Sequence, residues 1–459
     1  MGRTIFIPEN LFNYLISLTK PDGFTIGLIL GQSAGQKDYV VHLTKSPPPA
    51  PKNVVEETAQ LSGIALSNEI NDVYIKSIKD IPANWLADHA KHVIRMLPGG
   101  MYILGIFIVG PQDINNDNSN LEKLKLLLVA IERNISYNKY LYGSNNEEQL
   151  ILGFNSNTQK CTCRSVSKNG ILKPAECKFQ GKAIKWHQIE TLIDFDQLFH
   201  ISAKENSETL KNQLQNILED VSELINSAVV FIEGEARHKD DNLETIITVK
   251  ENKKEFKSNE NKKANEKPLQ ASLYIPCFSD PNYVIKLKTC TASIRLVGNL
   301  VSRTFLHQKA TIQEVTDAVK QDIIRSLASR LELHWDSLIE EENGLPEENI
   351  TLHEPPRRIL IALPESKITL SDYLFPGEGP QEALISLQEL LDLKVHESNI
   401  QKEIEVQVDP SEFYCRNEME AMPSDQSHAP FNNRRYKIYM TGLIVAFLVV
   451  LIAILVQLY

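Results

Sequence analysis

A strongly apolar segment at residues 438–459, uncharged in its side chains, constrains the structure that this chain can adopt more than any other feature. From Tyr439 to the last residue no side chain is charged, and thirteen of the 18 residues from 441 to 458 are Leu, Ile, Val or Phe. A helix of this length spans about 30 Å, the hydrocarbon thickness of a bilayer. A buried core helix would normally carry a polar stripe, and this segment has none. The sequence therefore predicts a single C-terminal transmembrane helix that anchors the chain through residues such as Tyr439, Leu443, Phe447, Leu451, Leu455 and Leu458.

The residues before this segment predict its orientation. A basic cluster of Arg434, Arg435 and Lys437 lies directly before the apolar run, and such clusters stay on the cytoplasmic side of a membrane. Residues 1–10 contain no apolar run long enough for a signal peptide. We therefore expect a single-pass, tail-anchored protein with a cytosolic body and with the lipid bilayer as the partner of its C-terminal helix.

The composition fits a folded cytosolic body. The 459 residues suffice for two domains of ordinary size, and the net charge of −11 argues against nucleic acid as a partner. The six cysteines are irregularly spaced: Cys161 and Cys163 form a C-x-C pair, but no second pair follows at zinc-finger spacing. We expect reduced thiols and no structural zinc site.

Two polar stretches divide the chain. Residues 236–268 are dominated by Lys, Glu and Asn and predict a charged, flexible linker. Residues 417–437 show no periodicity and predict a stalk that ends in the basic flank. These stretches separate a first domain at residues 1–235 from a smaller second domain at residues 269–416, and the stalk leads to the anchor at residues 438–459.

Both predicted domains mix helix and strand patterns, so the expected class is α/β in its mixed α+β form. In the first domain, residues 101–109 are almost wholly apolar, as in a strand buried on both faces. In the second domain, strand-like patterns at residues 292–298 and 299–306 precede Thr311. This Thr begins a capping box, with Glu314 three residues later, and predicts the start of a long helix.

Two shorter patterns complete the second domain. Residues 380–391 predict a helix, and residues 373–377 predict a turn with two aromatic side chains. Such a turn either docks a partner or folds back on its own core, and we favour the second interpretation.

The sequence contains none of the common catalytic motifs: no phosphate-binding loop, nucleophile elbow, zinc-protease helix or dinucleotide fingerprint. His89 and His92 stand three residues apart on a predicted helix, but no third ligand lies nearby, and the pattern favours a solvated face. Cys277, Cys290 and His307 follow one another too loosely to define a nucleophile site. We therefore assign no catalytic, cofactor-binding or metal-binding residue and expect no cofactor.

Two apolar segments, residues 27–31 and 104–111, resemble two strands of the MPN (JAB) isopeptidase fold. In active members of that fold a Glu precedes the first strand and a His-x-His-Pro follows the second. The resemblance sets Phe24 at the Glu position and Ile108 and Gly110 at the His positions. Zinc needs imidazole or carboxylate donors, which these three side chains lack. The resemblance therefore implies an MPN-like N-terminal domain that is a catalytically inactive copy, a pseudoenzyme kept as a binding scaffold.

A resemblance over nearly the full length is more specific. It is carried by residues 27–32 (GLILGQ), residues 97–100 (LPGG), the Arg357-Arg358 strand, residues 374–377 (LFPG) and the single C-terminal span. In these segments the sequence is similar to the Odr-four (odorant response abnormal protein four) homologue family.

This resemblance implies a tail-anchored protein of the endoplasmic reticulum membrane. It also implies two kinds of partner: the ubiquitin-fold-modifier-specific cysteine protease two, which would be recruited to the membrane, and a subset of G-protein-coupled receptors, whose folding and trafficking would be supported. The family brings no catalytic residue to carry over.

Three functions stay open at this stage. The sequence favours a non-catalytic adaptor whose body binds the protease and whose tail fixes its location. A membrane-embedded receptor chaperone that acts directly is the first alternative. An unrecognised hydrolase, dependent on a metal or on a thiol, is the second; a bound zinc ion or a Cys essential for turnover would identify it.

Overall fold

The computed structural model describes residues 2–21, 23–48, 75–143, 148–181, 184–202, 210–247, 267–275, 290–337, 352–353 and 355–405. The predicted transmembrane helix at residues 438–459, its basic flank and the stalk lie outside these ranges. Among the described residues, no helix combines the length and the hydrophobicity that a membrane span requires. The mixed α+β class is confirmed.

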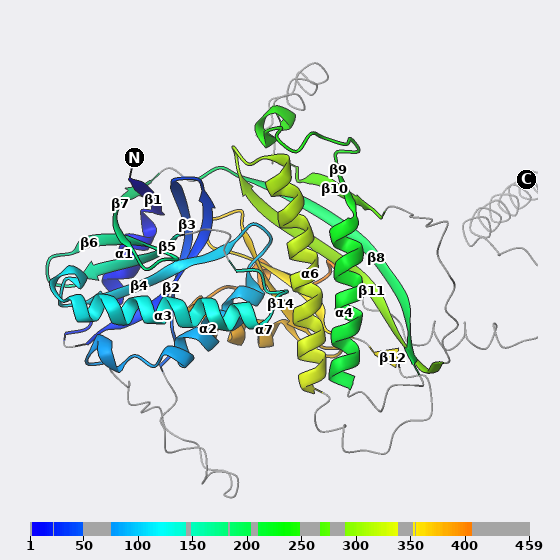
Figure 1. Ribbon diagram of the computed structural model, residues 1–459, viewed down its shortest axis with the longest axis horizontal. Coiled ribbons are helices and arrows are strands. Elements are labelled where there is room, and N and C mark those ends of the chain that lie inside the picture. The colour runs from blue at the N-terminus through cyan, green and yellow to red at the C-terminus, as the bar shows by residue number, and fades with distance from the viewer. Residues whose placement is uncertain are drawn as a thin grey trace, which may run out of the picture. The chain divides into compact units, whose positions relative to one another are not determined.

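Seven strands form a closed barrel in the order β1-β3-β2-β4-β5-β6-β7 (Figure 1). At its centre β2 pairs antiparallel with β4, from Thr25 opposite Val109 to Gly31 opposite Tyr102. All of β4 after Tyr102 is buried, as its apolar sequence predicted for a strand enclosed on both faces. The barrel strands are β1 (Arg3–Pro8), β2 (Thr25–Ala34), β3 (Lys37–Lys45), β4 (Tyr102–Gly110), β5 (Glu148–Asn155), β6 (Lys160–Ser167) and β7 (Leu172–Gln180).

Three helices complete this layer. α1 (Asn10–Ser17) packs Leu11 and Leu15 into a core with residues of β1, β4 and β5. α2 (Ala83–Met96) and α3 (Asn118–Tyr137) pack against each other and against the other face of β2 and β4. Each helix buries one apolar stripe, which is how an amphipathic sequence is stabilised on a sheet. Short 3-10 turns occur at Ile78–Asp80, Ile114–Asn116 and Glu397–Asn399.

A second sheet has the order β12-β11-β8-β10-β9. β8 (Trp186–Ser202) and β11 (Cys290–His307) pair antiparallel along almost their whole length, and α4 (Leu210–Ser227) and α6 (Ile312–Ser337) run side by side across the sheet (Figure 1). The two strands predicted at residues 292–298 and 299–306 are one continuous strand, because the chain stays extended through Gly298 and Asn299. The remaining strands are β9 (Val229–Ile232), β10 (Leu269–Tyr274) and β12 (Leu352–His353).

This second sheet crosses the domain boundary that the sequence suggested. β8 belongs to the predicted first domain and β11 to the predicted second, yet they are neighbours in one sheet, and residues 1–407 form one compact unit. Leu243 and Ile246, which fall inside the predicted linker 236–268, are buried against α4 and α6. Folded structure therefore extends into that stretch, because its few apolar residues complete this core.

A small sheet of order β14-β13-β15 packs with α7 (Pro380–Leu391) against α2. Its strands are β13 (Arg357–Ala362), β14 (Thr369–Leu374) and β15 (Ile400–Gln401). Tyr373 and Leu374 are buried on β14, so this segment folds back on its own core, as the favoured interpretation of residues 373–377 expected.

The barrel layer and the second sheet meet around Pro98 and Gly99. The backbone N–H of Phe305 on β11 donates to the carbonyl of Gly99 at 3.0 Å, and the guanidinium of Arg325 on α6 donates to the carbonyl of Pro98 at 2.8 Å. A Cβ at position 99 would overlap the side chain of Thr304, so only glycine permits this approach.

Buried ion pairs tie α6 to the small sheet. Both guanidinium ends of Arg358 bind the carboxylate of Asp322, at 2.7 and 3.0 Å, and both side chains are almost wholly buried. Burial by itself raises the pKa of Asp322, but the charge and hydrogen bonds of Arg358, together with the charge of Arg325 and the hydroxyl of Ser302, outweigh it and hold the pKa below its usual range.

A second buried carboxylate ends the described chain. Glu405, which is 2% exposed, accepts two hydrogen bonds from the guanidinium of Arg330, at 2.6 and 2.7 Å. It also accepts from the backbone N–H groups of Val301 at 2.8 Å and Arg358 at 2.7 Å. Each of these hydrogen bonds is charge-assisted and therefore strong.

Candidate functional site

The structure brings the three MPN-comparison positions together. Phe24 lies directly before β2, where its backbone N–H donates to Ile75 at 2.8 Å, and Gly110 ends the neighbouring strand β4. Ile108 pairs with Ile26 across the same two strands. The three positions thus lie at one end of the β2–β4 pair, although Phe24 is more than 80 residues from the other two in sequence.

The ring of Phe24 fills the space over Gly110. A Cβ at position 110 would overlap the Cδ1 and Cε1 atoms of Phe24, so a histidine could not stand there unless the ring moved. Ile108 is buried and Phe24 is half-buried, which makes this end of the strands an apolar surface. The side chains of Phe24 and Ile108 offer neither a metal ligand nor a general base, and Gly110 has no side chain.

The two acidic residues that follow β4, Asp113 and Asp117, accept hydrogen bonds from backbone N–H groups. Asp113 accepts a hydrogen bond from the N–H of Asn115 at 2.9 Å, and Asp117 caps α3 by accepting from the N–H of Ser119 at 2.8 Å. Within the described ranges, no three His, Cys, Asp or Glu side chains gather closely enough to hold a metal ion.

His89 is not on a solvated face, contrary to the favoured interpretation of the His89 and His92 pair. It is 4% exposed, its Nε2 lies 2.7 Å from the carbonyl of Leu390, and its Nδ1 lies 3.0 Å from the hydroxyl of Ser46. Since a carbonyl only accepts, Nε2 carries the proton and Nδ1 accepts from Ser46. His92 is exposed, so α2 turns the two rings to different surroundings and does not present them as a metal-binding pair.

His42, on β3, contacts the same end of α7. It is also buried, and its Nε2 lies 3.3 Å from the carbonyl of Leu391. Burial lowers the pKa of both His42 and His89 to about 4. Two neutral imidazoles therefore satisfy the last carbonyls of α7, which a helix end otherwise leaves unpaired. No local pattern could predict this pairing, because His42 and Leu391 are far apart along the chain.

The side chains of Cys161, Cys163 and Cys177 line the barrel. Cys163 is buried, and Cys161 and Cys177 are half-buried on the neighbouring strands β6 and β7. Burial raises the pKa of Cys161 to about 12 and raises that of Cys163, whereas a hydrogen bond with Cys163 lowers the pKa of Cys177. Cys277, which the sequence analysis considered with Cys290 and His307 and did not assign to a nucleophile site, lies outside the described residues.

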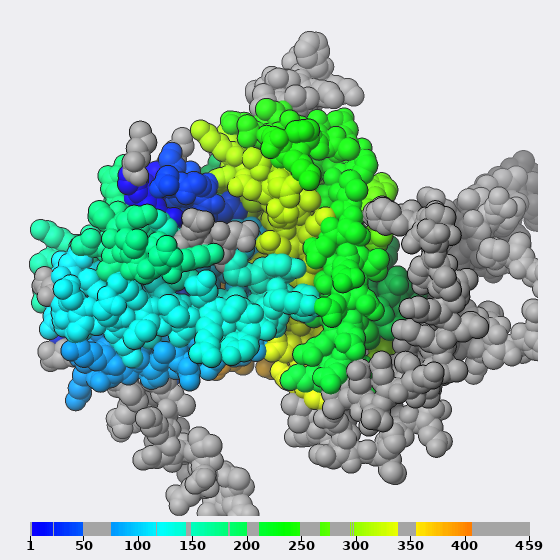
Figure 2. Space-filling model, in the orientation of Figure 1, coloured from blue at the N-terminus to red at the C-terminus, as the bar shows by residue number. Residues whose placement is uncertain are grey.

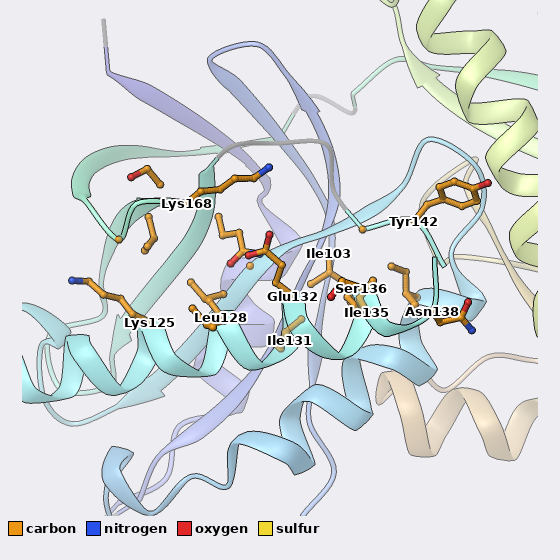
Figure 3. A pocket seen from close by; sticks show the side chains of 18 of the residues that line it. Ile103, Lys125, Leu128, Ile131, Glu132, Ile135, Ser136, Asn138, Tyr142 and Lys168 are labelled. Carbon is orange, nitrogen blue, oxygen red and sulfur yellow. The ribbon is translucent and has the colours of Figure 1, made fainter. Parts of the chain in front are cut away.

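A groove runs along one flank of α3 (Figure 3). Its volume is about 260 Å³, and its floor is apolar, built from Leu128, Ile131 and Ile135 of α3 together with Ile103 of β4. Lys125 and Glu132 of α3 stand on its rim, and Lys168 from the β6–β7 turn lies on the opposite rim. An apolar floor with charged edges suits the binding of a side chain or a peptide and supplies no nucleophile with an adjacent base.

The fold and this site define a mixed α+β protein with an apolar-floored groove beside α3 and an apolar strand end at Phe24 and Gly110. The model of one protein family, described as "ODR4-like: Odorant response abnormal 4-like", matches residues 27–402. The chain therefore belongs to the ODR4-like family.

Curated relatives are similar in sequence to this chain over most of its length. The protein odr-4 homolog of Mus musculus is 28% identical over 88% of this chain and 87% of its own length. That of Homo sapiens is 27% identical, with 99% of this chain and 98% of the relative covered. The odorant response abnormal protein 4 of Caenorhabditis elegans is 21% identical over 76% of this chain and 71% of its own length.

Solved structures show weaker likenesses. The crystal structure of UfSP from C. elegans matches with a TM-score of 0.40 and 9% identity, covering 86% of this chain and 57% of that one. The solution structure of DSY2949 from Desulfitobacterium hafniense matches with a TM-score of 0.20 and 12% identity over 39% of this chain and 94% of that one. Likenesses of this size do not define a shared fold.

Proposed function

We propose that this protein is a non-catalytic, tail-anchored adaptor of the endoplasmic reticulum membrane. In this proposal the barrel is an MPN-like scaffold without a metal site, and the body recruits the ubiquitin-fold-modifier-specific protease two. The single observation that carries the proposal is the packing of Phe24 on Gly110. The apolar ring of Phe24 lies where an active isopeptidase would need zinc ligands and a general base.

Family membership supports the receptor part of the proposal. The C. elegans relative is named for an abnormal odorant response, and the matching family carries the same description. We extend this to support of folding and trafficking for a subset of G-protein-coupled receptors. The apolar segment at residues 438–459 and the flank of Arg434, Arg435 and Lys437 supply the proposed anchor and its orientation.

The test is affinity capture with the full-length chain and with a chain that ends at residue 433, followed by mass spectrometry. Recovery of the protease in near-stoichiometric amount by both chains would support the adaptor. Recovery of receptors, and only by the full-length chain, would favour the alternative of a membrane-embedded chaperone.

The hydrolase alternative has its own readout. Metal analysis of the purified chain, and alkylation of its thiols followed by an assay for modifier cleavage, would detect a metal or thiol enzyme. A stoichiometric zinc ion, or turnover by the chain alone that alkylation abolishes, would overturn the adaptor proposal.

A further inference from the structure

The outer face of α3 carries an exposed stripe from Glu122 to Tyr137, which is about four turns of the helix. Leu126 and Val129 are 63% and 59% exposed, and Tyr137 is 78% exposed, although all three are large apolar or aromatic side chains. Glu122 and Arg133 are exposed at the same face. Figure 2 shows α3, in cyan, along the face of the molecule turned to the viewer. This stripe lies opposite the buried one, which includes Leu124, Leu127, Leu128, Ile131 and Ile135.

The stripe has the spacing of a helix–helix seam. Glu122, Leu126, Val129 and Arg133 follow one another at intervals of four, three and four residues, the alternation found at the contact positions of a coiled coil. A surface helix that only faces water normally places polar residues at all such positions. Here the two central positions are apolar and the two outer positions carry opposite charges.

The charges fit a second copy of the same helix in one orientation. When two α3 helices run antiparallel, Leu126 meets Val129 of the second copy, and Glu122 meets Arg133 of the second copy at both ends. On the flank, Lys125 then faces Glu132 of the second copy. A parallel pair would instead place Glu122 against Glu122 and Arg133 against Arg133, which like-charge repulsion disfavours.

Arg133, one of the two outer residues of this seam, already contacts Tyr137 within its own helix. The Arg133 guanidinium lies 5.9 Å from the ring centre of Tyr137 and its Nη2 donates to the Tyr137 hydroxyl at 3.4 Å, so part of its side-chain freedom is lost before any partner binds. Glu122 pairs with Lys125 at 2.6 Å, an exposed ion pair that can be exchanged for an intermolecular one at little cost.

We propose that α3 is a homodimerisation surface, on which two copies of this chain associate antiparallel through Leu126 and Val129, with Glu122 and Arg133 pairing at the two ends. The pairing is isologous, as expected for a two-fold symmetric dimer. It does not depend on the proposed adaptor function, because it rests on α3 alone.

The charge pattern allows a test by complementary reversal. We would measure the mass of the full-length chain in detergent micelles by light scattering over a range of concentrations, for the wild type, Glu122→Arg and Arg133→Glu. Each single reversal places two like-charged pairs in the dimer and should weaken it about tenfold or more. An equimolar mixture of the two single variants should associate again, because every end pair then joins opposite charges.

The controls separate pairing from unfolding. Glu389→Arg reverses an exposed charge on α7 and should leave the wild-type mass unchanged. Circular dichroism should be the same for all variants, because the altered side chains are exposed. A wild type that stays monomeric at every concentration, single variants that dimerise as the wild type does, or a mixture that fails to associate would each overturn the proposal.

Discussion

The side-chain oxygen of Gln32 accepts a 2.8 Å hydrogen bond from the backbone N–H of His307, a residue 275 positions later. The amide nitrogen of the same side chain donates to the carbonyls of Gly100 at 2.6 Å and Phe305 at 3.1 Å. Gln32 is 4% exposed, so one buried amide joins the barrel strand β2 to β11 of the second sheet. The two layers are therefore linked by hydrogen bonds as well as by apolar packing.

Gln32→Leu should destabilise the whole described body. The substitution leaves the N–H of His307 and two carbonyls without this partner in a buried place, and we expect a loss of roughly 2–4 kcal/mol in the free energy of unfolding. Urea denaturation followed by fluorescence measures it. Gln36→Leu, in the exposed turn after β2, is the matched control and should change stability by less than about 0.5 kcal/mol. Equal losses for both variants would contradict the role given to Gln32.

Gly110→Ala should be more costly than an ordinary Gly-to-Ala change, because the new Cβ overlaps the ring of Phe24. We expect a destabilisation of about 1–3 kcal/mol, the usual range for overpacking. In a Phe24→Ala background the overlap is gone, and the cost of Gly110→Ala should fall by about 1 kcal/mol or more.

Gly143→Ala is the control for this double-mutant cycle. A Cβ at position 143 would meet Ile135 at 3.6 Å, an ordinary contact, so the change should be nearly neutral in both backgrounds. Strict additivity of Phe24→Ala and Gly110→Ala would show that the two positions do not touch.

Acid should loosen the docking of α7 before it affects most carboxylates. In the folded state the pKa of His42 and of His89 is lowered by burial to about 4, below the value of about 6.5 for an unperturbed histidine. The unfolded chain therefore takes up more protons between these values. The contribution of these neutral histidines to the free energy of unfolding is fully present above about pH 6.5. It is lost as the pH falls toward about 4, by on the order of 3 kcal/mol per histidine.

The measurement is the urea midpoint at several pH values from 7.5 to 4.5. His89→Gln stays neutral and retains donors and acceptors, so it should flatten the decline by about half. His238→Gln, whose parent side chain is 76% exposed, should leave the pH dependence as it is. A wild type equally stable at pH 7.5 and pH 5 would contradict the burial of neutral histidines at α7.

Local patterns predicted local structure well. The helix expected at residues 380–391 has the bounds of α7. Thr311 forms the expected capping box: the backbone N–H of Glu314 donates to the Thr311 hydroxyl at 3.2 Å, and the Glu314 carboxylate accepts from the N–H of Thr311 at 2.7 Å. Such signals are readable because the interacting groups are only three residues apart.

Long-range pairing could not be read in the same way. The pairing of β8 with β11 joins residues about a hundred positions apart, and the sequence of neither strand indicates which other strand it pairs with. Leu243 and Ile246 lie in a stretch predicted to be a charged linker, and their place in a core depends on contacts with α4 and α6. At the candidate site, the sequence identified Phe24, Ile108 and Gly110 as comparable positions, but only the structure shows that the Phe24 ring occupies the space above Gly110.

The attachment of Glu405 has a mechanical consequence. β15, the last strand before it, pairs with β13 through only two residues and could be peeled away easily. A pull on the chain beyond residue 405, however, would first load the carboxylate of Glu405, whose four hydrogen bonds come from α6, β11 and β13. The load is thereby shared by three elements of the core at once, so the body resists being unravelled from its C-terminal side.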